Sequence, residues 1–184
     1  MNIVLVTGGF DPIHSGHIAY FEQARSLGDK LIVGLNSDAW LIRKKGRPLM
    51  SQEERQTIIQ HLRMVDEVVT STAYDDMDGS SSYLIRQSLE RYPNDQIIFA
   101  NGGDRTKTNI PEMSIQDPRL SFEFGVGGEH KQNSSSWILN DYADYLRHQI
   151  ISEISTKVQH IKVWDIDLGV YIKQQYQIDN TKDS

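Results

Sequence analysis

The chain has 184 residues, of which 38% are hydrophobic and 24% charged, as in one soluble globular domain. With 19 Lys and Arg against 25 Asp and Glu, its formal net charge is -6, which argues against a general nucleic-acid or anionic-membrane surface. Cysteine is absent, which excludes disulfides, thiolate metal sites and a cysteine nucleophile. The sequence has no run of about 18 apolar residues and no signal-peptide pattern, so we expect a cytoplasmic protein.

Apolar runs alternate with helix-period segments through most of the chain, which is typical of a parallel sheet covered by helices. The expected strands are 3–6, 31–35, 67–70, 97–100 and 121–124. The expected helices begin near His17 and after Ser51, and cover 82–92 and 135–147. Ser51 and Glu54 have the spacing of a capping box, which makes the helix after Ser51 the most clearly marked one.

The last part of the chain breaks this rhythm. We assign residues 1–148 to the main domain and 149–184 to a C-terminal extension of it. Within the extension, 161–165 and 170–178 can pair as strands, or the second segment can be helical. The extension also contains four large apolar side chains, Trp164, Tyr171, Ile172 and Tyr176. Exposed apolar clusters often mark interfaces, so we expect a homodimer contact here, with packing back on the monomer as the alternative.

The strongest motif, Gly8–His17, follows the first strand and opens the first helix. A glycine turn at a helix start binds anions, because backbone N–H groups approach a phosphate and the helix dipole adds positive charge. His14 and His17 can then donate hydrogen bonds to one phosphoryl group as charge develops on it, so they are the catalytic candidates. The alternatives are a helix start with incidental histidines, or half of a metal site. The expected nucleotide-binding residues of this motif are Gly8, Gly9, Phe10, Asp11 and Gly16.

A basic run, Arg43–Arg47, supplies four cations in five residues on the predicted loop after the second strand. Such a run is commonly a solvated face, and a nuclear-localisation signal is another reading. In an acidic chain, a cationic loop at the same sheet edge as a phosphate-binding turn can hold the β- and γ-phosphates and the departing pyrophosphate. We favour this phosphate-binding interpretation.

A second glycine turn, Asn101–Arg105, follows the fourth strand as the first motif follows the first strand. In a doubly wound sheet of order 3-2-1-4-5 these two strands are neighbours, so both turns open into one crevice. Asn101, Gly103 and Asp104 are therefore candidates for nucleotide binding, the alternative being a turn whose glycines serve only backbone geometry. Arg105 and Lys107 are candidates for binding the substrate phosphate.

Together these motifs resemble the nucleotidyltransferase superfamily with the His-x-Gly-His signature. Within it, the chain resembles the cytidylyltransferase-like group, which includes the glycerol-3-phosphate cytidylyltransferases. The resemblance runs from Asn2 to about Leu139, and His14-Ser15-Gly16-His17 matches the signature itself. It implies an α/β fold with a Rossmann-like, doubly wound parallel sheet flanked by helices, so that residues 1–148 form a nucleotidyltransferase domain.

The resemblance also implies roles for individual residues. Lys44 falls at the position of a triphosphate-binding lysine, which adds it to the catalytic candidates. Arg63 corresponds to a residue that contacts nucleotide or substrate phosphate, and Arg55 lies in a similar helix and is expected near the substrate. The segment 133–138 resembles a hydroxyl-rich helix start that binds triphosphate, here through Ser134, Ser135 and Ser136. Relatives carry an arginine shortly before these serines, so in this chain Lys131 replaces it or the contact is lost.

The implied reaction is attack of a phosphorylated acceptor on the α-phosphate of a nucleoside triphosphate accompanied by Mg²⁺, with release of pyrophosphate. CTP is the expected nucleotide, and a sugar or polyol phosphate such as glycerol 3-phosphate is the expected acceptor. Asp11 is a carboxylate that can help to place the metal ion or serve only the turn, and the sequence does not identify the metal ligands. The rivals are an ATP-dependent adenylyltransferase of the same superfamily and a non-catalytic nucleotide-binding regulatory module, which only the missing arginine favours.

Overall fold

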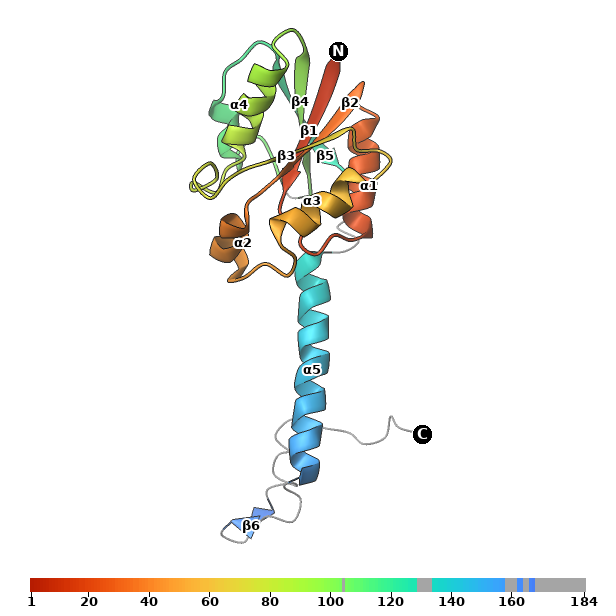
Figure 1. Cartoon of the computed structure of the whole chain (residues 1–184), viewed down its shortest axis with the longest axis vertical. Coiled ribbons are helices and arrows are strands. Elements are labelled where there is room, and N and C mark those ends of the chain that lie inside the picture. Colours follow the sequence, from red (N-terminus) through yellow and green to blue (C-terminus); the bar gives the residue numbers. More distant parts are fainter. Residues whose placement is uncertain (104, 129–133, 158–161, 164–165, 168–184) are drawn as a thin grey trace. The chain divides into compact units, whose positions relative to one another are not determined.

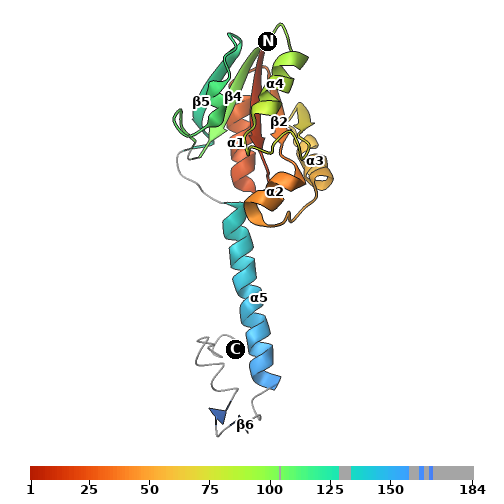
Figure 2. The same cartoon turned by 90° about the vertical axis from the view of Figure 1, so that its left-hand side faces the viewer.

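The structure is a computed structural model, shown in Figures 1 and 2, and it describes residues 1–103, 105–128, 134–157, 162–163 and 166–167. The chain divides into two compact units, Met1–Ser135 and Ser136–Ser184. The first unit contains the five-stranded sheet and every glycine motif that the sequence singles out.

The sheet of the first unit is parallel throughout and runs in the order β3-β2-β1-β4-β5, which confirms the predicted topology. Its strands are β1 Asn2–Gly8, β2 Lys30–Leu35, β3 Glu67–Thr70, β4 Gln96–Gly102 and β5 Leu120–Val126. The central strand β1 pairs on both sides, since Val4 lies opposite Leu31 of β2 and opposite Ile98 of β4. The carboxyl ends of β1 and β4 are therefore adjacent, as both glycine turns require.

Helices cover both faces of the sheet (Figure 1). They are α1 Ser15–Arg25, α2 Asp38–Lys45, α3 Gln52–Gln60 and α4 Ser82–Arg91, with a 3₁₀ turn, η1, at Pro111–Ser114. Side chains alternate along β1, so that Ile3 and Leu5 share a core cluster with residues of α4. Val4 and Val6 share the other cluster with residues of α1 and α3. This two-sided burial is the physical basis of the doubly wound fold.

Helix α2 is the main departure from the predicted elements, because the sequence placed the whole basic run on a loop. In the structure Arg43, Lys44 and Lys45 form the last turn of α2, and Gly46 ends the helix with φ +87°. The helix begins where the Ser37 hydroxyl accepts a hydrogen bond from Trp40 N at 3.0 Å. Cations in the last helical turn interact favourably with the carbonyl end of the helix dipole.

The second unit contains all but the first residue of α5 Ser135–Lys157, a helix that begins at the predicted residue and continues beyond 147. It also contains two short strands, β6 Lys162–Val163 and β7 Ile166–Asp167, which pair antiparallel. The segment 170–178 and the four apolar residues of the predicted dimer contact, Trp164, Tyr171, Ile172 and Tyr176, lie outside the described residues. Within the described part of the chain, no helix is both long enough and apolar enough to span a membrane.

Candidate active site

The first site element is the turn Gly8–His14, which connects β1 to α1 and is named the phosphate turn after its predicted role. His14 caps α1: its Nδ1 accepts a hydrogen bond from Gly16 N at 3.1 Å, and its carbonyl accepts one from His17 N at 2.9 Å. Because Nδ1 is the acceptor, the proton of a neutral His14 ring lies on Nε2. The capping bond therefore fixes a tautomer in which Nε2–H is a donor.

The two signature histidines are brought together. The rings of His14 and His17 stack, with centroids 3.8 Å apart and planes inclined by 26°. The ring of His17 also makes a T-shaped contact with Phe10 at 5.0 Å between centroids, and Phe10 in turn packs against Phe21 at 4.9 Å. Phe10 is buried and has φ +49°, an uncommon conformation for a residue other than glycine. Its ring therefore supports His17, and its contact with nucleotide stays a prediction.

The glycines of the turn are required by close packing. A Cβ on Gly8 would lie 2.9 Å from Cζ of Phe10, and one on Gly9 would lie 2.8 Å from Cδ2 of Leu41 and 3.2 Å from Cζ3 of Trp40. Both distances below 3.0 Å are shorter than real Cβ contacts. The phosphate turn therefore lies directly against α2, and a side chain at Gly9 would displace the side chains of Leu41 and Trp40.

Asp11 fastens the turn from inside. Its side chain is buried, and its two carboxylate oxygens accept hydrogen bonds from Leu49 N at 2.7 Å and Met50 N at 2.9 Å. Its carbonyl oxygen accepts a further bond from Lys45 Nζ at 2.7 Å. These contacts support the structural interpretation of Asp11. Among the residues that the structure describes, no group of three His, Asp or Glu side chains converges on a possible metal site.

Arg55, expected near the substrate, is buried and hydrogen-bonds to several segments of the protein; we call this set of contacts the Arg55 clamp. Its Nη1 donates to the carbonyls of Gly9 at 2.6 Å and Asn36 at 3.1 Å, and its Nε donates to the carbonyl of Met50 at 3.2 Å. Its Nη2 donates to Oδ1 of Asp38 at 2.6 Å. This side chain is 0% exposed, and its bonds join the ends of β1 and β2 to α2 and α3.

The three cations at the end of α2 have different surroundings. Arg43 donates to the Asp76 carboxylate at 2.8 Å, and Lys45 donates to the Asp11 carbonyl. The ammonium group of Lys44 lies over the ring of Trp40, 4.3 Å from its centroid. Trp40 also lies close to the phosphate turn, since a Cβ on Gly9 would be 3.2 Å from its Cζ3, so the ring that carries the Lys44 ammonium belongs to the part of α2 that packs against the turn.

The second glycine turn lies at the same sheet edge. The Asn101 side chain is buried and donates to the carbonyl of Phe99 at 3.2 Å, and Gly103 has φ +65°, which favours glycine. Helix α1 reaches this edge through Tyr20, whose hydroxyl donates to the Ala100 carbonyl at 2.6 Å and whose pKa is raised by burial. The positive charge of Arg105 acts in the opposite direction on the pKa of the same hydroxyl, but burial has the larger effect. Asp104 lies outside the described residues, and Lys107 is exposed.

The remaining predicted residues are spread more widely. Ser134 and Ser135 are buried, and the Ser135 hydroxyl donates to the Pro12 carbonyl at 2.9 Å, beside the phosphate turn. Ser136 is exposed and belongs to the second unit, while Lys131 lies outside the described residues. Arg63 is 89% exposed at its side chain and lies 3.5 Å from Glu22 of α1.

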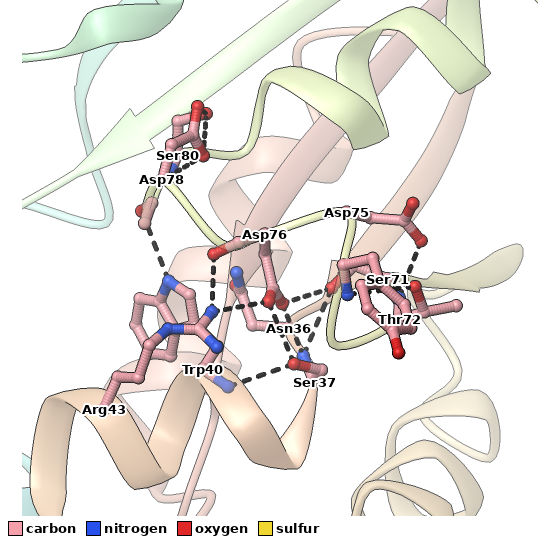
Figure 3. Close-up of polar contacts among 12 residues, drawn as sticks. Asn36, Ser37, Trp40, Arg43, Ser71, Thr72, Asp75, Asp76, Asp78 and Ser80 are labelled. Carbon is pink, nitrogen blue, oxygen red and sulfur yellow. Dashed lines mark hydrogen bonds and ion pairs between the residues drawn. The ribbon is translucent and has the colours of Figure 1, made fainter.

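Sequence reasoning missed a polar cluster at the carboxyl ends of β2 and β3, shown in Figure 3. At its centre the buried Asp76 carboxylate accepts hydrogen bonds from Ser37, Ser71 and Arg43. Burial alone would raise the pKa of Asp76, but these donors hold it below its ordinary value. A sequence signal that points to this cluster is Ser37-Asp38, which is a favourable helix start.

The parallel sheet, the glycine turn and the paired histidines at the start of α1 define an α/β nucleotidyltransferase. The chain belongs to the cytidylyltransferase-like family, whose model matches residues 5–156. It is 51% identical over 147 residues to the bifunctional protein HldE of Geobacter sulfurreducens, covering 77% of this chain and 28% of that protein. For HldE of Pelobacter propionicus the identity is 49% over 146 residues, with the same coverage of 77% and 28%. The chain thus spans only 28% of the length of these two relatives.

Solved structures with this fold are more distant in sequence. The lipopolysaccharide core biosynthesis protein from Thermoplasma volcanium is 24% identical with a TM-score of 0.50, over 71% of this chain and 99% of that one. The bifunctional NMN adenylyltransferase/ADP ribose pyrophosphatase from Francisella tularensis, complexed with AMP and Mn ion, is 14% identical with a TM-score of 0.51, over 96% of this chain and 51% of that one. Both likenesses concern the fold alone.

Proposed function

We propose that this nucleotidyltransferase transfers the nucleotidyl group of a nucleoside triphosphate to a sugar phosphate or polyol phosphate. An oxygen of the acceptor phosphate attacks the α-phosphorus, the bond to the β-phosphate oxygen breaks, and pyrophosphate leaves. The observation that carries the proposal is the stacked pair His14 and His17 at the N-terminus of α1. Two imidazoles at a helix start, beside the cationic turn of α2, suit a reaction in which negative charge accumulates on phosphoryl oxygens.

Each group has a distinct part in this proposal. His14 and His17 donate hydrogen bonds to the α-phosphate as the pentacoordinate transition state forms. Lys44 binds the β- and γ-phosphates and stabilises the departing pyrophosphate. No covalent enzyme intermediate is needed, because positioning and charge stabilisation carry most of the catalysis of phosphoryl transfer. The remaining candidates, Asn101, Gly103, Arg63, Arg105, Lys107, Ser134, Ser135 and Ser136, are assigned to nucleotide or acceptor binding.

Magnesium enters the proposal with the nucleotide. Mg²⁺ usually keeps several waters and binds one or two carboxylates together with substrate phosphates. The Asp11 carboxylate is already bonded to two backbone amides and is a poor fit for a metal ligand in this arrangement. We therefore assign the ion to the phosphates of the nucleotide.

CTP is the first nucleotide to test, because the family resemblance around Lys44 and Asn101 is to cytidylyltransferases. An adenylyltransferase that uses ATP is the second candidate, since the segment Gly8–His14 occurs in both groups and does not specify the base. The homodimer and the cytoplasmic location stay predictions.

The test is release of pyrophosphate by the chain with Mg²⁺ and each of the four nucleoside triphosphates, with either glycerol 3-phosphate or a sugar 1-phosphate. We expect pyrophosphate release only when both substrates are present. Mass spectrometry should then detect an NDP-linked product of the matching mass. A variant with both His14→Ala and His17→Ala is the control. Nucleotide binding without release from any pair of substrates would contradict the proposal.

A further inference from the structure

Asp76 lies on the segment 71–81 between β3 and α4, and its carboxylate is fully engaged. Oδ2 accepts hydrogen bonds from Ser71 Oγ at 2.6 Å and Ser37 N at 2.9 Å. Oδ1 accepts them from Arg43 Nη2 at 2.8 Å and Ser37 Oγ at 3.0 Å. The residue is 1% exposed. Buried ionised groups are retained only when charge-assisted bonds compensate the loss of water, and here each oxygen has two donors.

These bonds hold both ends of one short helix. Ser37 is the N-cap of α2, and Arg43 lies in its last turn. Arg43 Nη2 also donates to the Asp76 carbonyl at 2.6 Å, and Trp40 Nε1 donates to the Gly79 carbonyl at 3.2 Å. The segment 71–81 is therefore hydrogen-bonded to the start, the middle and the end of α2, as Figure 3 shows.

Apolar packing holds α2 only weakly by comparison. Leu41 is the buried residue of this eight-residue helix, and Ile42 is 53% exposed. An isolated helix of this length is unstable in water, so its position depends on tertiary contacts. Because α2 buries only one apolar side chain, the polar contacts to Asp76 make up a large share of the tertiary contacts that hold this helix.

The position of α2 matters because the helix lies against the phosphate turn. Its Trp40 ring touches Gly9 and carries the Lys44 ammonium over its face. A shift of α2 therefore moves Lys44 relative to His14 and His17. In a reaction that depends on positioning, a misplacement of about 1 Å can lower the rate about 10²-fold.

We propose that Asp76 is a positioning residue for nucleotidyl transfer: without touching substrate, its carboxylate fixes both ends of α2 and thereby places Lys44 at the phosphate turn. The proposal rests on the phosphate-binding role proposed above for Lys44. The competing view is that Asp76 only stabilises the segment 71–81, in which case its loss lowers stability and leaves the kinetics of the folded enzyme unchanged.

The experiment compares kcat and KM for the nucleotide, per folded molecule, in Asp76→Asn, Lys44→Ala and the double variant. The asparagine keeps the size of the side chain but directs an amide NH₂ at donors. We expect kcat/KM to fall about 10-fold to 10²-fold in Asp76→Asn. We expect the double variant to be no worse than the more impaired single variant, because a displaced Lys44 has little left to lose.

Two further variants make the test specific. Asp78→Asn is the matched control: it removes the same charge from the same segment, but Asp78 accepts its bonds from Ser80 and none of its bonds reach α2. It should keep the kinetics of the original chain. Ser37→Ala serves if Asp76→Asn does not fold, since it breaks the hydroxyl bond to Asp76 and the cap on Trp40 N. Ser37→Ala should lower kcat/KM, as Asp76→Asn does.

The outcomes separate the two proposals. Unchanged kcat/KM in a folded Asp76→Asn or Ser37→Ala variant, or effects of Asp76→Asn and Lys44→Ala that multiply, would overturn the positioning role while leaving the proposed reaction intact. If Lys44→Ala has no effect, both the phosphate role of Lys44 and its positioning by Asp76 are wrong. An original chain that releases no pyrophosphate would instead contradict the proposed function.

Discussion

His14 and His17 lie in contact as a stacked pair, with ring centroids 3.8 Å apart. His14 is held by its capping bond to Gly16 N, and His17 by the edge of Phe10. Two imidazoles fixed so closely at a helix start can act on the same phosphoryl group. Contacts within the protein hold both rings in place, and groups preorganised in this way can stabilise a transition state more than a ground state.

We therefore expect His14→Ala and His17→Ala each to lower turnover about 10²-fold to 10³-fold, with a smaller loss of nucleotide affinity, by analogy with the loss of one preorganised donor. Turnover and melting temperature are measured on the same preparation. A structural histidine would behave differently, since its removal would lower the melting temperature and spare turnover. Near-normal turnover in both variants would refute the catalytic role.

Lys44→Ala should weaken nucleotide affinity and turnover together, because a charge-assisted contact to phosphate contributes about 1.5 to 3 kcal/mol. Titration calorimetry gives the affinity and pyrophosphate release gives the turnover. Lys45→Ala is the comparison: it removes the bond to the Asp11 carbonyl and should mainly lower stability. If Lys45→Ala damages binding and Lys44→Ala does not, the phosphate-binding lysine has been assigned one residue too early.

CTP with magnesium should raise the melting temperature more than ATP, GTP or UTP does. A nucleotide present at 100 times its dissociation constant stabilises the folded state by about 2.7 kcal/mol, which thermal-shift measurements detect readily. The same titration with the His14→Ala chain serves as a control, since that variant should still bind. A larger shift with ATP would make the adenylyltransferase the correct assignment.

The order of the sheet was predictable because buried parallel strands leave strong local signals. The run from Ile3 to Val6 is continuous and apolar, which is typical of a buried strand. Helix α3 is marked by its capping serine, because the Ser51 hydroxyl accepts a hydrogen bond from Glu54 N at 3.2 Å. The phosphate turn was predictable because its glycines and histidines are adjacent in the chain. Its position at the carboxyl end of β1, next to β4, follows directly from the strand order.

What could not be predicted depends on long-range polar contacts. Arg55 reads as one more cation on an amphipathic helix, yet it bonds to residues as far along the chain as Gly9. Asp76 reads as part of a polar loop, yet its partners Ser37 and Arg43 precede it by 39 and 33 residues. Helix α2 escaped detection because it buries only Leu41, so it has almost no hydrophobic periodicity.

Arg55→Ala should destabilise the fold strongly. Removing Arg55 leaves the carbonyls of Gly9, Asn36 and Met50 without this donor, and an unsatisfied buried polar group costs about 1 to 3 kcal/mol. The ion pair adds less, because the Asp38 side chain is 39% exposed and can be hydrated. Urea unfolding, followed by circular dichroism, measures the change. Arg63→Ala removes the same charge from an exposed side chain and should change stability by less than about 0.5 kcal/mol. Equal stabilities for the two variants would show that the Arg55 clamp contributes little.

The last prediction concerns acid. The pKa of Asp76 is lowered in the folded chain, because its hydrogen bonds outweigh the effect of burial, and the pKa of Glu67 is lowered in the same way by Lys30 and Tyr92. A carboxyl with a lower pKa in the folded state binds protons more readily when unfolded, so its stabilisation is present above the ordinary pKa of about 4 and is lost as the pH falls through the lower folded value. The free energy of unfolding should therefore decrease steadily below about pH 4.

Asp76→Asn should be less stable at pH 7 and should lose less stability on acidification, because one of the responsible groups is gone. Parallel curves of unfolding free energy against pH for the two chains would show that Asp76 has the same pKa folded and unfolded.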